Sequence, residues 1–527
     1  MSSLLKALPR GIYSTAQVRG FDRHAIDELG IEGFELMRRA GQAALDFLRA
    51  GWPEARSLVI YCGAGNNGGD GYVLAALAAA AGLEARVVAV IDPATLTGDA
   101  ARALGLAREA GIGIAGFAEA GAAEPTGATG AAAAGSADDR VVLVDALLGT
   151  GLTRDVDGAL AEAVARLNAA TGPVLALDVP TGLDSDTGAI RGVAVEADAT
   201  ITFVGQKSGL YLGAGPGCRG RLGFAALGLP DAVYRTARPV LRRLDPADLG
   251  LILKRRSRMS HKGLNGRVLI VGGQPGMAGA ARLAAEAALR SGAGLVHAAV
   301  APESVAAVMA GRPEIMCRGV TRPADFDDWT EAADVVVVGP GLGRAAWGTE
   351  LAEAMFSSDR PLVVDADALN HLAANRSGRG NWVLTPHPGE AGRLLGSSAG
   401  AVQLARDEAA AALARDYRAI VVLKGACSLV ARPAPGGARN ERIAEDGETA
   451  AVAVCDYGNP GMATGGMGDV LSGVIGGLGA ELGLSAATVE TAVLAHALAG
   501  DDAAEDGERG LVASDLFVHL RRRVNPV

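Results

Sequence analysis

The sequence predicts an α/β protein built from two domains in series. A chain of 527 residues is long enough for two domains of ordinary size. Apolar residues make up 49% of it, aromatic residues only 4%, and 74 residues are Gly, a composition that favours an α/β fold over a β-sandwich. Short apolar runs alternate with helix-length segments in both halves, which indicates parallel sheets covered on both faces.

The first half contains five strand-like apolar runs, and helix-length segments rich in Ala, Leu and Arg separate several of them. The runs are 57–62, 85–91, 141–144, 174–177 and 200–204. The Ala/Gly-rich stretch 110–137 has little pattern, so we expect helix and loop there without a functional role.

The periodicity fades between residues 230 and 258, where Arg and Pro accumulate. We therefore expect domains at 1–240 and 241–527. Beyond the boundary the apolar runs resume, at 268–271, 294–300, 335–338, 362–364, 382–384 and 420–423. The two halves carry different motifs, which argues against an internal duplication.

Charge and composition exclude several classes of partner. The net charge is −10 and no basic run of five residues occurs, which disfavours nucleic acid and anionic membranes. The five Cys are scattered without a C-x-x-C pair, and no apolar run reaches the ~20 residues of a membrane span. The start has no signal-like apolar core, so we expect a cytoplasmic protein. Only five Lys occur against 44 Arg, which makes each Lys, Lys424 among them, informative.

A glycine-rich segment at 63–71 follows the first strand-like run and precedes a helix expected at 72–81. Gly63, Gly65 and Gly68 fit the G-x-G-x-x-G spacing that brings backbone N–H groups to a pyrophosphate. A turn without a ligand would give the same spacing. Asn66, Asn67 and Asp70 distinguish this segment, because a carboxylate beside a phosphate needs a cation or a ribose hydroxyl to offset its charge. No Gly-Lys-Ser/Thr follows, so it is not a Walker A loop.

Two Asp residues follow neighbouring strands of the same expected sheet. Asp145 comes directly after 141–144, and Asp178 directly after 174–177. Each could simply cap a helix. Ligands of open parallel sheets bind outside the carboxyl ends of the strands, so we expect both carboxylates to face the crevice of the Asn-rich segment.

These motifs resemble the NAD(P)H-hydrate epimerase family over about residues 10–230, which implies a Rossmann-like α/β sandwich. The family interconverts the R and S hydrates at carbon 6 of the reduced nicotinamide, and Asp178 is our candidate for the proton-transferring group. A potassium ion is implied at Asn67, Asp145 and Thr181. The implied substrate contacts are Asn66, Asn67, Gly68, Gly69, Asp70, Gly149, Thr150, Gly151, Leu152, Thr153, Arg154, Asp155 and Asp178.

The second half carries the strongest local signal, Gly465-Gly466-Met467-Gly468-Asp469. A glycine turn at the start of a helix presents N–H groups to an anion. Asp469 could cap that helix. The flanking glycines favour a second role, in which Asp469 accepts the proton of a hydroxyl that attacks a phosphoryl group.

Four further segments follow strand-like runs, as a crevice site demands: 339–343, 365–369, 385–390 and 424–428. His387 lies between two prolines, which favours a ligand role over a buried, satisfied histidine. In this order the motifs resemble the ribokinase-like fold, and within it the ADP-dependent NAD(P)H-hydrate dehydratase family, over about residues 245–527.

That resemblance implies an ADP site and the catalytic base Asp469, with Mg²⁺ accompanying the nucleotide and ADP converted to AMP and phosphate. The implied hydrate contacts are Ala280, Gly341, His387 and Asp469; those of the nucleotide are Lys424, Gly425, Ala426, Cys427, Ser428 and Gly468. A homo-oligomer is also implied.

The sequence therefore predicts a bifunctional repair enzyme for hydrated nicotinamide cofactors. Three alternatives stay open. The first half could be an NAD-dependent oxidoreductase, although Glu84 and Asp92 straddle the expected acid position. The second half could be a kinase of a sugar or vitamin precursor. Both could form a non-catalytic scaffold.

Overall fold

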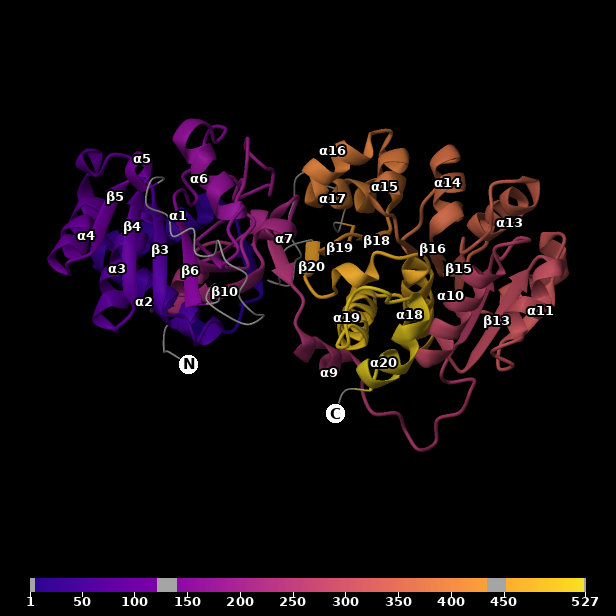
Figure 1. The fold of residues 1–527 in the computed structure, drawn as a ribbon. Helices are drawn as coiled ribbons and strands as arrows, with labels where there is room; N and C mark the ends of the chain where they lie inside the picture. The colour runs from indigo at the N-terminus through magenta and orange to yellow at the C-terminus, as the bar shows by residue number, and fades with distance from the viewer. Residues whose placement is uncertain (1–4, 121–139, 434–451, 526–527) are drawn as a thin grey trace, which may run out of the picture. The chain divides into compact units, whose positions relative to one another are not determined.

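The computed structural model describes residues 5–120, 140–433 and 452–525. The chain divides into two compact units, 1–240 and 241–527, drawn from indigo to magenta and from magenta to yellow in Figure 1. Each unit is an α/β structure built around a largely parallel sheet, as predicted. No helix of the described ranges is long and apolar enough to cross a membrane.

The sheet of the first unit has the strand order β1-β10-β8-β7-β6-β3-β4-β5. All neighbours pair in parallel except the edge strand β1. Its strands are β1 (Leu5–Lys6), β3 (Ser57–Cys62), β4 (Glu84–Ala89), β5 (Gly113–Gly116), β6 (Val141–Ala146), β7 (Val174–Leu177), β8 (Ala199–Phe203) and β10 (Arg221–Ala225). β2 (Gly11–Tyr13) forms a short parallel pair with β9 (Gln206–Lys207).

Helices cover both faces of this sheet. They are α1 (Thr15–Asp27), α2 (Gly33–Gly51), α3 (Asn66–Ala80), α4 (Gly98–Glu109), α5 (Phe117–Ala120), α6 (Gly158–Asn168), α7 (Gly215–Cys218) and α8 (Asp231–Tyr234). Successive residues of β3 alternate between two cores, as the pleat requires. Leu58 and Ile60 pack with α1–α4, whereas Val59 and Tyr61 pack with α5 and α6.

The order of the strands reverses between β3 and β6. From β3 the chain moves outward through β4 and β5, then returns to the other side of β3 with β6 and continues through β7 and β8. Ligand crevices of open α/β sheets lie at such a reversal, beyond the carboxyl ends of the strands. The segments that follow β3, β6 and β7 therefore meet where the sequence predicted a site.

Two local expectations in this unit are wrong. The helix expected at 72–81 begins six residues earlier, so Asn66–Gly71 form its first turns. Glycine permits this, because a Cβ on Gly68 would collide with the carbonyl oxygen of Gly63, and one on Gly71 would lie 2.6 Å from Ala146 Cβ. In the stretch 110–137, Gly113–Gly116 form the strand β5; residues 121–137 lie outside the described ranges.

The second unit has a sheet with the order β14-β13-β12-β15-β16-β17-β18-β19-β20-β11. Pairing is parallel from β14 to β18, and β19 is antiparallel to both of its neighbours. The strands are β11 (Leu241–Arg243), β12 (Arg267–Val271), β13 (Leu295–Val300), β14 (Met316–Gly319), β15 (Val335–Val338), β16 (Leu362–Val364), β17 (Trp382–Leu384), β18 (Ile420–Leu423), β19 (Ser428–Ala431) and β20 (Val452–Cys455).

Helices again lie on both faces of the sheet (Figure 1). They are α9 (Leu249–Ile252), α10 (Ala278–Arg290), α11 (Val305–Met309), α12 (Asp327–Ala332), α13 (Ala346–Ser357), α14 (Ala366–Ala374), α15 (Pro388–Leu395), α16 (Ala399–Leu404), α17 (Arg406–Tyr417), α18 (Met467–Leu482), α19 (Ala486–Ala503) and α20 (Leu516–Arg523). One face of the sheet packs against α10, α18 and α19. The strands expected in both halves are confirmed to within about two residues at each end.

The close approach of α3 to the sheet generates a stability prediction. Gly71→Ala should destabilise the first unit by about 1–3 kcal/mol, because its Cβ would lie 2.6 Å from Ala146 Cβ and 2.8 Å from Cys62 Sγ. The matched control is Gly105→Ala in α4, whose Cβ would meet no atom within 4 Å. It should stabilise by up to about 1 kcal/mol through helix propensity. Denaturant titration of the full chain measures both changes, and equal midpoints would contradict the prediction.

Candidate functional sites

The first unit contains a cavity of about 490 Å³ beyond the carboxyl ends of β3, β6 and β7. Seven of the predicted contacts line it: Asn66, Asn67, Asp70, Gly149, Thr150, Gly151 and Asp178. Four charged residues that the sequence reasoning missed line it as well: Arg19, Asp22, Asp99 and Lys207. The structure thus gathers the Asn-rich segment and one of the two expected Asp residues in one crevice.

Lys207 forms a buried ion pair with Asp178. Its Nζ donates to Asp178 Oδ1, to Phe203 O at 2.7 Å and to Thr202 Oγ1 at 3.1 Å, which uses all three of its protons. The Lys207 side chain is 2% exposed. The scarcity of Lys in an Arg-rich chain was the signal that could have pointed to this residue.

Asp145 does not line the cavity but accepts a hydrogen bond from Leu147, which does. It is fully buried, and its carboxylate accepts bonds from Thr181 N and Thr181 Oγ1, each at 2.7 Å, and from Leu147 N at 3.2 Å. Burial raises the pKa of Asp145 to about 6, although the bonds from Thr181 and Leu147 oppose the rise. Thr181 Oγ1 also accepts from Leu148 N at 2.9 Å, so this cluster ties the ends of β6 and β7 together.

Asn67 has a side-chain amide that is buried yet lacks hydrogen-bond partners. The residue is only 7% exposed, and neither Nδ2 nor Oδ1 of its side chain has a hydrogen-bond partner. A Cβ on Gly149 would lie 3.4 Å from Asn67 Oδ1 and 3.3 Å from Asp178 Oδ2. Because orphaned buried amides are costly, this geometry points to a bound group between Asn67, Gly149 and Asp178.

Three non-glycine residues that line the cavity have left-handed backbone conformations. They are Asp178 (φ +64°), Val204 (φ +63°) and Leu227 (φ +51°). Each such conformation costs roughly 1–2 kcal/mol. Strain of this kind persists where the surroundings fix it and concentrates at functional sites.

The six other predicted contacts of the first site are not among the residues that line this cavity. Gly68 and Gly69 pack against Gly63 and Met37, respectively, where a Cβ would not fit. The residues Leu152, Thr153, Arg154 and Asp155 do not line the cavity.

The Thr181 cluster generates a prediction. Thr181→Val removes a donor to buried Asp145 and an acceptor for Leu148 N, so it should destabilise the first unit by about 1–3 kcal/mol. Thr181→Ser keeps the hydroxyl and should destabilise the first unit much less than Thr181→Val does. Denaturant midpoints of the two variants compare them directly, and indistinguishable midpoints would count against the hydrogen-bond account.

In the second unit, the strands β15, β16, β17 and β18 are consecutive parallel neighbours, so the four predicted segments share one sheet edge. Asp365, the first residue of one of these segments, is 1% exposed and bonds to Lys424 of another. Its Oδ1 accepts from Lys424 Nζ at 2.8 Å, and its Oδ2 from Ser472 Oγ at 2.6 Å. Burial alone would raise the pKa of Asp365, but Lys424 and Ser472 hold it below its usual value.

Lys424 lies beside the glycine turn at the start of α18. A Cβ on Gly468 would lie 3.3 Å from Lys424 Nζ and 3.9 Å from Asp365 Oδ2. Burial opposes the charge of Lys424, yet Asp365 and Glu390 raise its pKa above the usual value. Two predicted nucleotide contacts, Lys424 and Gly468, are therefore adjacent.

The first turn of α18 carries Asp469. Gly466 precedes it in the left-handed region (φ +92°), and buried His496 donates from Nε2 to Met467 O at 3.1 Å. Burial and the nearby Asp365 raise the pKa of Asp469 to about 7, with Lys424 opposing the rise. Such a carboxyl group changes its charge near neutral pH, as a general base should.

The segment 424–428 is the turn of a hairpin between β18 and β19, a pairing that the sequence reasoning missed. Buried Arg406 holds it from below by donating to Cys427 O at 2.9 Å and to the carbonyl oxygens of Leu423 and Lys424 at 3.4 Å. A side chain at Gly425 would collide with the Arg406 guanidinium. Arg406 lies in a helix, away from every motif, so nothing in the sequence marked it.

Apart from Asp469, the predicted hydrate contacts of this unit fall into two places. A Cβ on Gly341 would lie 3.2 Å from Ala280 Cβ, so these two residues are neighbours at the reversal between β12 and β15. His387 caps α15: its Nδ1 accepts from Gly389 N at 3.0 Å, and its side chain is half exposed. Burial and the positive charge of Lys424 lower the pKa of His387.

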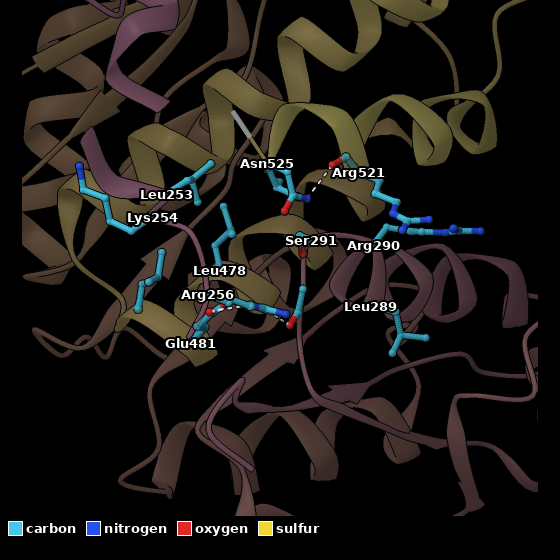
Figure 2. A pocket seen from close by; sticks show the side chains of 13 residues that line it. Leu253, Lys254, Arg256, Leu289, Arg290, Ser291, Leu478, Glu481, Arg521 and Asn525 are labelled. Carbon is cyan, nitrogen blue, oxygen red and sulfur yellow. Dashed lines mark hydrogen bonds and ion pairs between the residues drawn. The ribbon is translucent and has the colours of Figure 1, made fainter. Parts of the chain in front are cut away.

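A separate cavity of about 390 Å³ lies at the other end of α18, near Leu478 and Leu482 (Figure 2). Leu482 lies thirteen residues after Asp469 on α18, which corresponds to about 20 Å along the helix axis. In the cavity, Arg256 donates to Glu481 Oε1 at 2.8 Å and to Gly292 O at 2.6 Å. This cavity is therefore not part of the site around Asp469.

Two crevices of this construction, each with a glycine turn and an Asp at a strand end that is paired with a Lys, define a two-domain α/β enzyme. The model of the family NAD(P)H-hydrate dehydratase matches residues 268–522, and that of the YjeF-related protein N-terminus matches 33–209.

Curated relatives match the whole chain. The bifunctional NAD(P)H-hydrate repair enzyme Nnr of Coxiella burnetii is 44% identical over 98% of this chain and 99% of its own. That of Escherichia coli is 40% identical over 99% and 95%. The chain belongs to the family of bifunctional NAD(P)H-hydrate repair enzymes, as the sequence predicted.

Among solved structures, the ADP/ATP-dependent NAD(P)H-hydrate dehydratase from Bacillus subtilis, co-crystallised with ATP and Mg²⁺, is 26% identical. It matches 53% of this chain and 96% of its own, with a TM-score of 0.45.

Proposed function

We propose that the unit 1–240 interconverts the R and S hydrates of NADH and NADPH, and that the unit 241–527 dehydrates the S hydrate with ADP. The observation that carries this proposal is Asp469 at the glycine turn, beside the Lys424–Asp365 pair. Transfer of a phosphoryl group to a hydroxyl requires a base whose pKa lies near neutral pH and a cation beside an anion-binding turn.

In the dehydratase reaction, the Asp469 carboxylate takes the proton of the carbon-6 hydroxyl, and the oxygen attacks the terminal phosphorus of ADP. The bond to AMP breaks, and the N–H groups at Gly466–Gly468 stabilise the transferred group. Phosphate then leaves carbon 6 as the ring nitrogen supplies electrons, and loss of a proton from the adjacent carbon restores the reduced nicotinamide.

The nucleotide in this proposal lies along 424–428, with its phosphates toward Lys424 and Gly468. The described residues include no cluster of three or more His, Cys, Asp or Glu side chains suited to a metal. Mg²⁺ commonly binds through phosphate oxygens and waters, so we propose that it arrives with the nucleotide. Ala280, Gly341 and His387 contact the hydrate in this arrangement.

In the first unit, Asp178 transfers protons at carbon 6, and the residues that line the cavity hold the dinucleotide. A potassium ion fits the polar atoms gathered near the end of β6, because Asn67 has an unpaired buried amide and Thr181 and Asp145 lie against the same segment. Bound there, the ion would offset the charge of carboxylates close to a phosphorylated ligand.

An epimerase and a dehydratase on one chain form a complete repair route. The dehydratase accepts one epimer, and the epimerase supplies it from the other. We place this activity in the cytoplasm, consistent with five free cysteines. Assembly into a homo-oligomer stays a prediction that sedimentation of the purified chain tests.

The direct test is turnover of purified protein on each separated hydrate. With ADP, the S hydrate should yield the reduced-nicotinamide absorbance with one AMP and one phosphate per turnover. The R hydrate should follow through epimerisation. A stable phosphorylated product would instead indicate a small-molecule kinase, and no turnover with ADP or ATP would indicate a scaffold.

Asp469→Asn should lower the dehydration rate by about 10²–10⁴-fold, because the base is lost, while epimerisation continues. Exposed Asp506→Asn is the matched control and should leave both rates unchanged. The wild-type dehydration rate should fall as the pH drops below about 7, since the base must be ionised. Loss of both activities in a folded Asp469→Asn protein would contradict the division of labour.

Replacing potassium by a bulky organic cation should slow epimerisation severalfold or more and leave dehydration of the pure S hydrate unchanged. The reason is that the ion belongs to the first unit. Epimerisation followed chromatographically without ADP isolates the effect, and rates that do not depend on the cation would argue against the site.

A further inference from the structure

The first cavity contains more acid groups than its lysine can neutralise. Asp22, Asp70, Asp99 and Asp178 line it, together with Lys207 and with Arg19, whose guanidinium donates to Thr150 O. All three Lys207 protons go to Asp178, Thr202 and Phe203, so none is left for Asp22 or Asp70. Carboxyl groups that share a site cannot all ionise, because like charges repel at short range.

Asp22 is held over this cavity by its neighbours on α1. The helix begins at Thr15, whose N donates to Asp186 Oδ1 at 2.6 Å. One turn before Asp22, Arg19 donates to the carbonyl oxygen of Thr150, which also lines the cavity, at 2.8 Å. Phe21 is buried against Tyr13 and Tyr234, with ring centroids 4.9 and 5.3 Å away. These contacts fix the backbone at Asp22 relative to Asp178.

The Asp22 carboxyl has no hydrogen bond or ion pair within the described ranges, so it is available to a ligand. Burial raises its pKa to about 6, with Lys207 lowering it and Asp178 raising it further. Burial, Asp178 and Asp22 raise the pKa of Asp70 well above its usual value. The other charged or titratable groups near Asp22 are Arg19 on α1, Asp99 on α4 and Tyr234 on α8.

We propose that Asp22 is the general acid of epimerisation and acts opposite Asp178, the carboxylate paired with Lys207. This inference rests on the proposed epimerase function and adds a residue that lies ahead of the matched family segment 33–209. It divides the work between two groups, one that delivers a proton and one that receives it.

The reaction balances without an oxidant or reductant. Asp22 protonates the carbon-6 hydroxyl, the C–O bond breaks, water leaves, and the lone pair of the ring nitrogen forms a double bond to carbon 6. Water then attacks carbon 6 from the opposite face, the electron pair returns to nitrogen, and Asp178 takes the surplus proton. Asp178 afterwards gives a proton to solvent and Asp22 regains one.

Asp22→Asn tests this role, with Asp27→Asn as the control, since Asp27 is exposed at the end of the same helix. The R hydrate is incubated without ADP and the epimers are separated, so the second unit is silent. We expect kcat for epimerisation to fall about 10²–10⁴-fold in Asp22→Asn, with KM within about threefold of wild type. Asp22→Glu should recover part of the rate, and Asp27→Asn should match wild type.

The pH profile separates a proton donor from a structural residue. A donor must be protonated, so the wild-type epimerisation rate should fall tenfold per pH unit as the pH rises above the pKa of Asp22, about 6. Asp22→Asn should lack this alkaline limb. An unchanged limb, or a wild-type kcat in Asp22→Asn, would overturn the proposal. Denaturant unfolding of Asp22→Asn reports whether the first unit is folded, and a wild-type chain that fails to epimerise would overturn the proposed function instead.

Discussion

Each site depends on one lysine that pairs with the aspartate at the end of a parallel strand: buried Lys207 with Asp178, and partly buried Lys424 with Asp365. Transfer of two charges out of water costs several kcal/mol per ion, and the pair recovers this only when hydrogen bonds saturate both partners. The structure meets that demand, because Lys207 uses three acceptors and Asp365 binds Ser472 as well as Lys424. Lys suits these positions better than the abundant Arg, since its ammonium is a compact point charge on a flexible stem. The pairs fix where each strand-end carboxylate lies, and the remaining site groups are arranged around them.

The proposed chemistry relies on the acidic residues that these pairs leave without a counter-charge. Asp22 and Asp70 share the first cavity with one lysine, and Asp469 lies beside a lysine already paired with Asp365. Burial and neighbouring carboxylates raise the pKa values of all three. The strained backbones of Asp178 and of Ala366, directly after Asp365, lie at the same places. The strained backbone at the sites therefore lowers the free energy of unfolding, and burial of the apolar strands beneath the sites offsets that loss.

Local patterns predicted the strands and the strand-end motifs because a buried parallel strand is a continuous apolar run with few alternatives, as 335–338 and 420–423 illustrate. Local patterns failed to predict features whose place in the structure depends on tertiary packing. The start of α3 depends on Gly68 and Gly71 fitting against Gly63 and Ala146, which helix propensity argues against. Lys207 follows Val204, whose positive φ breaks the strand pattern, and Asp22 and Arg406 lie within helices as ordinary polar residues. Only the folded chain brings these three to the sites.

In the proposed reactions, the two units place opposite demands on the same carbon-6 hydroxyl. In the first, departure of the oxygen needs a protonated acid, whereas in the second its attack on phosphorus needs an ionised base. Burial raises the pKa of Asp22 to about 6 and that of Asp469 to about 7, so the protonated fraction of the first declines as the ionised fraction of the second grows. The two forms are present together in the largest amount between these two pKa values. In this proposal, the burial that raises both pKa values also sets the pH range in which the two steps run together.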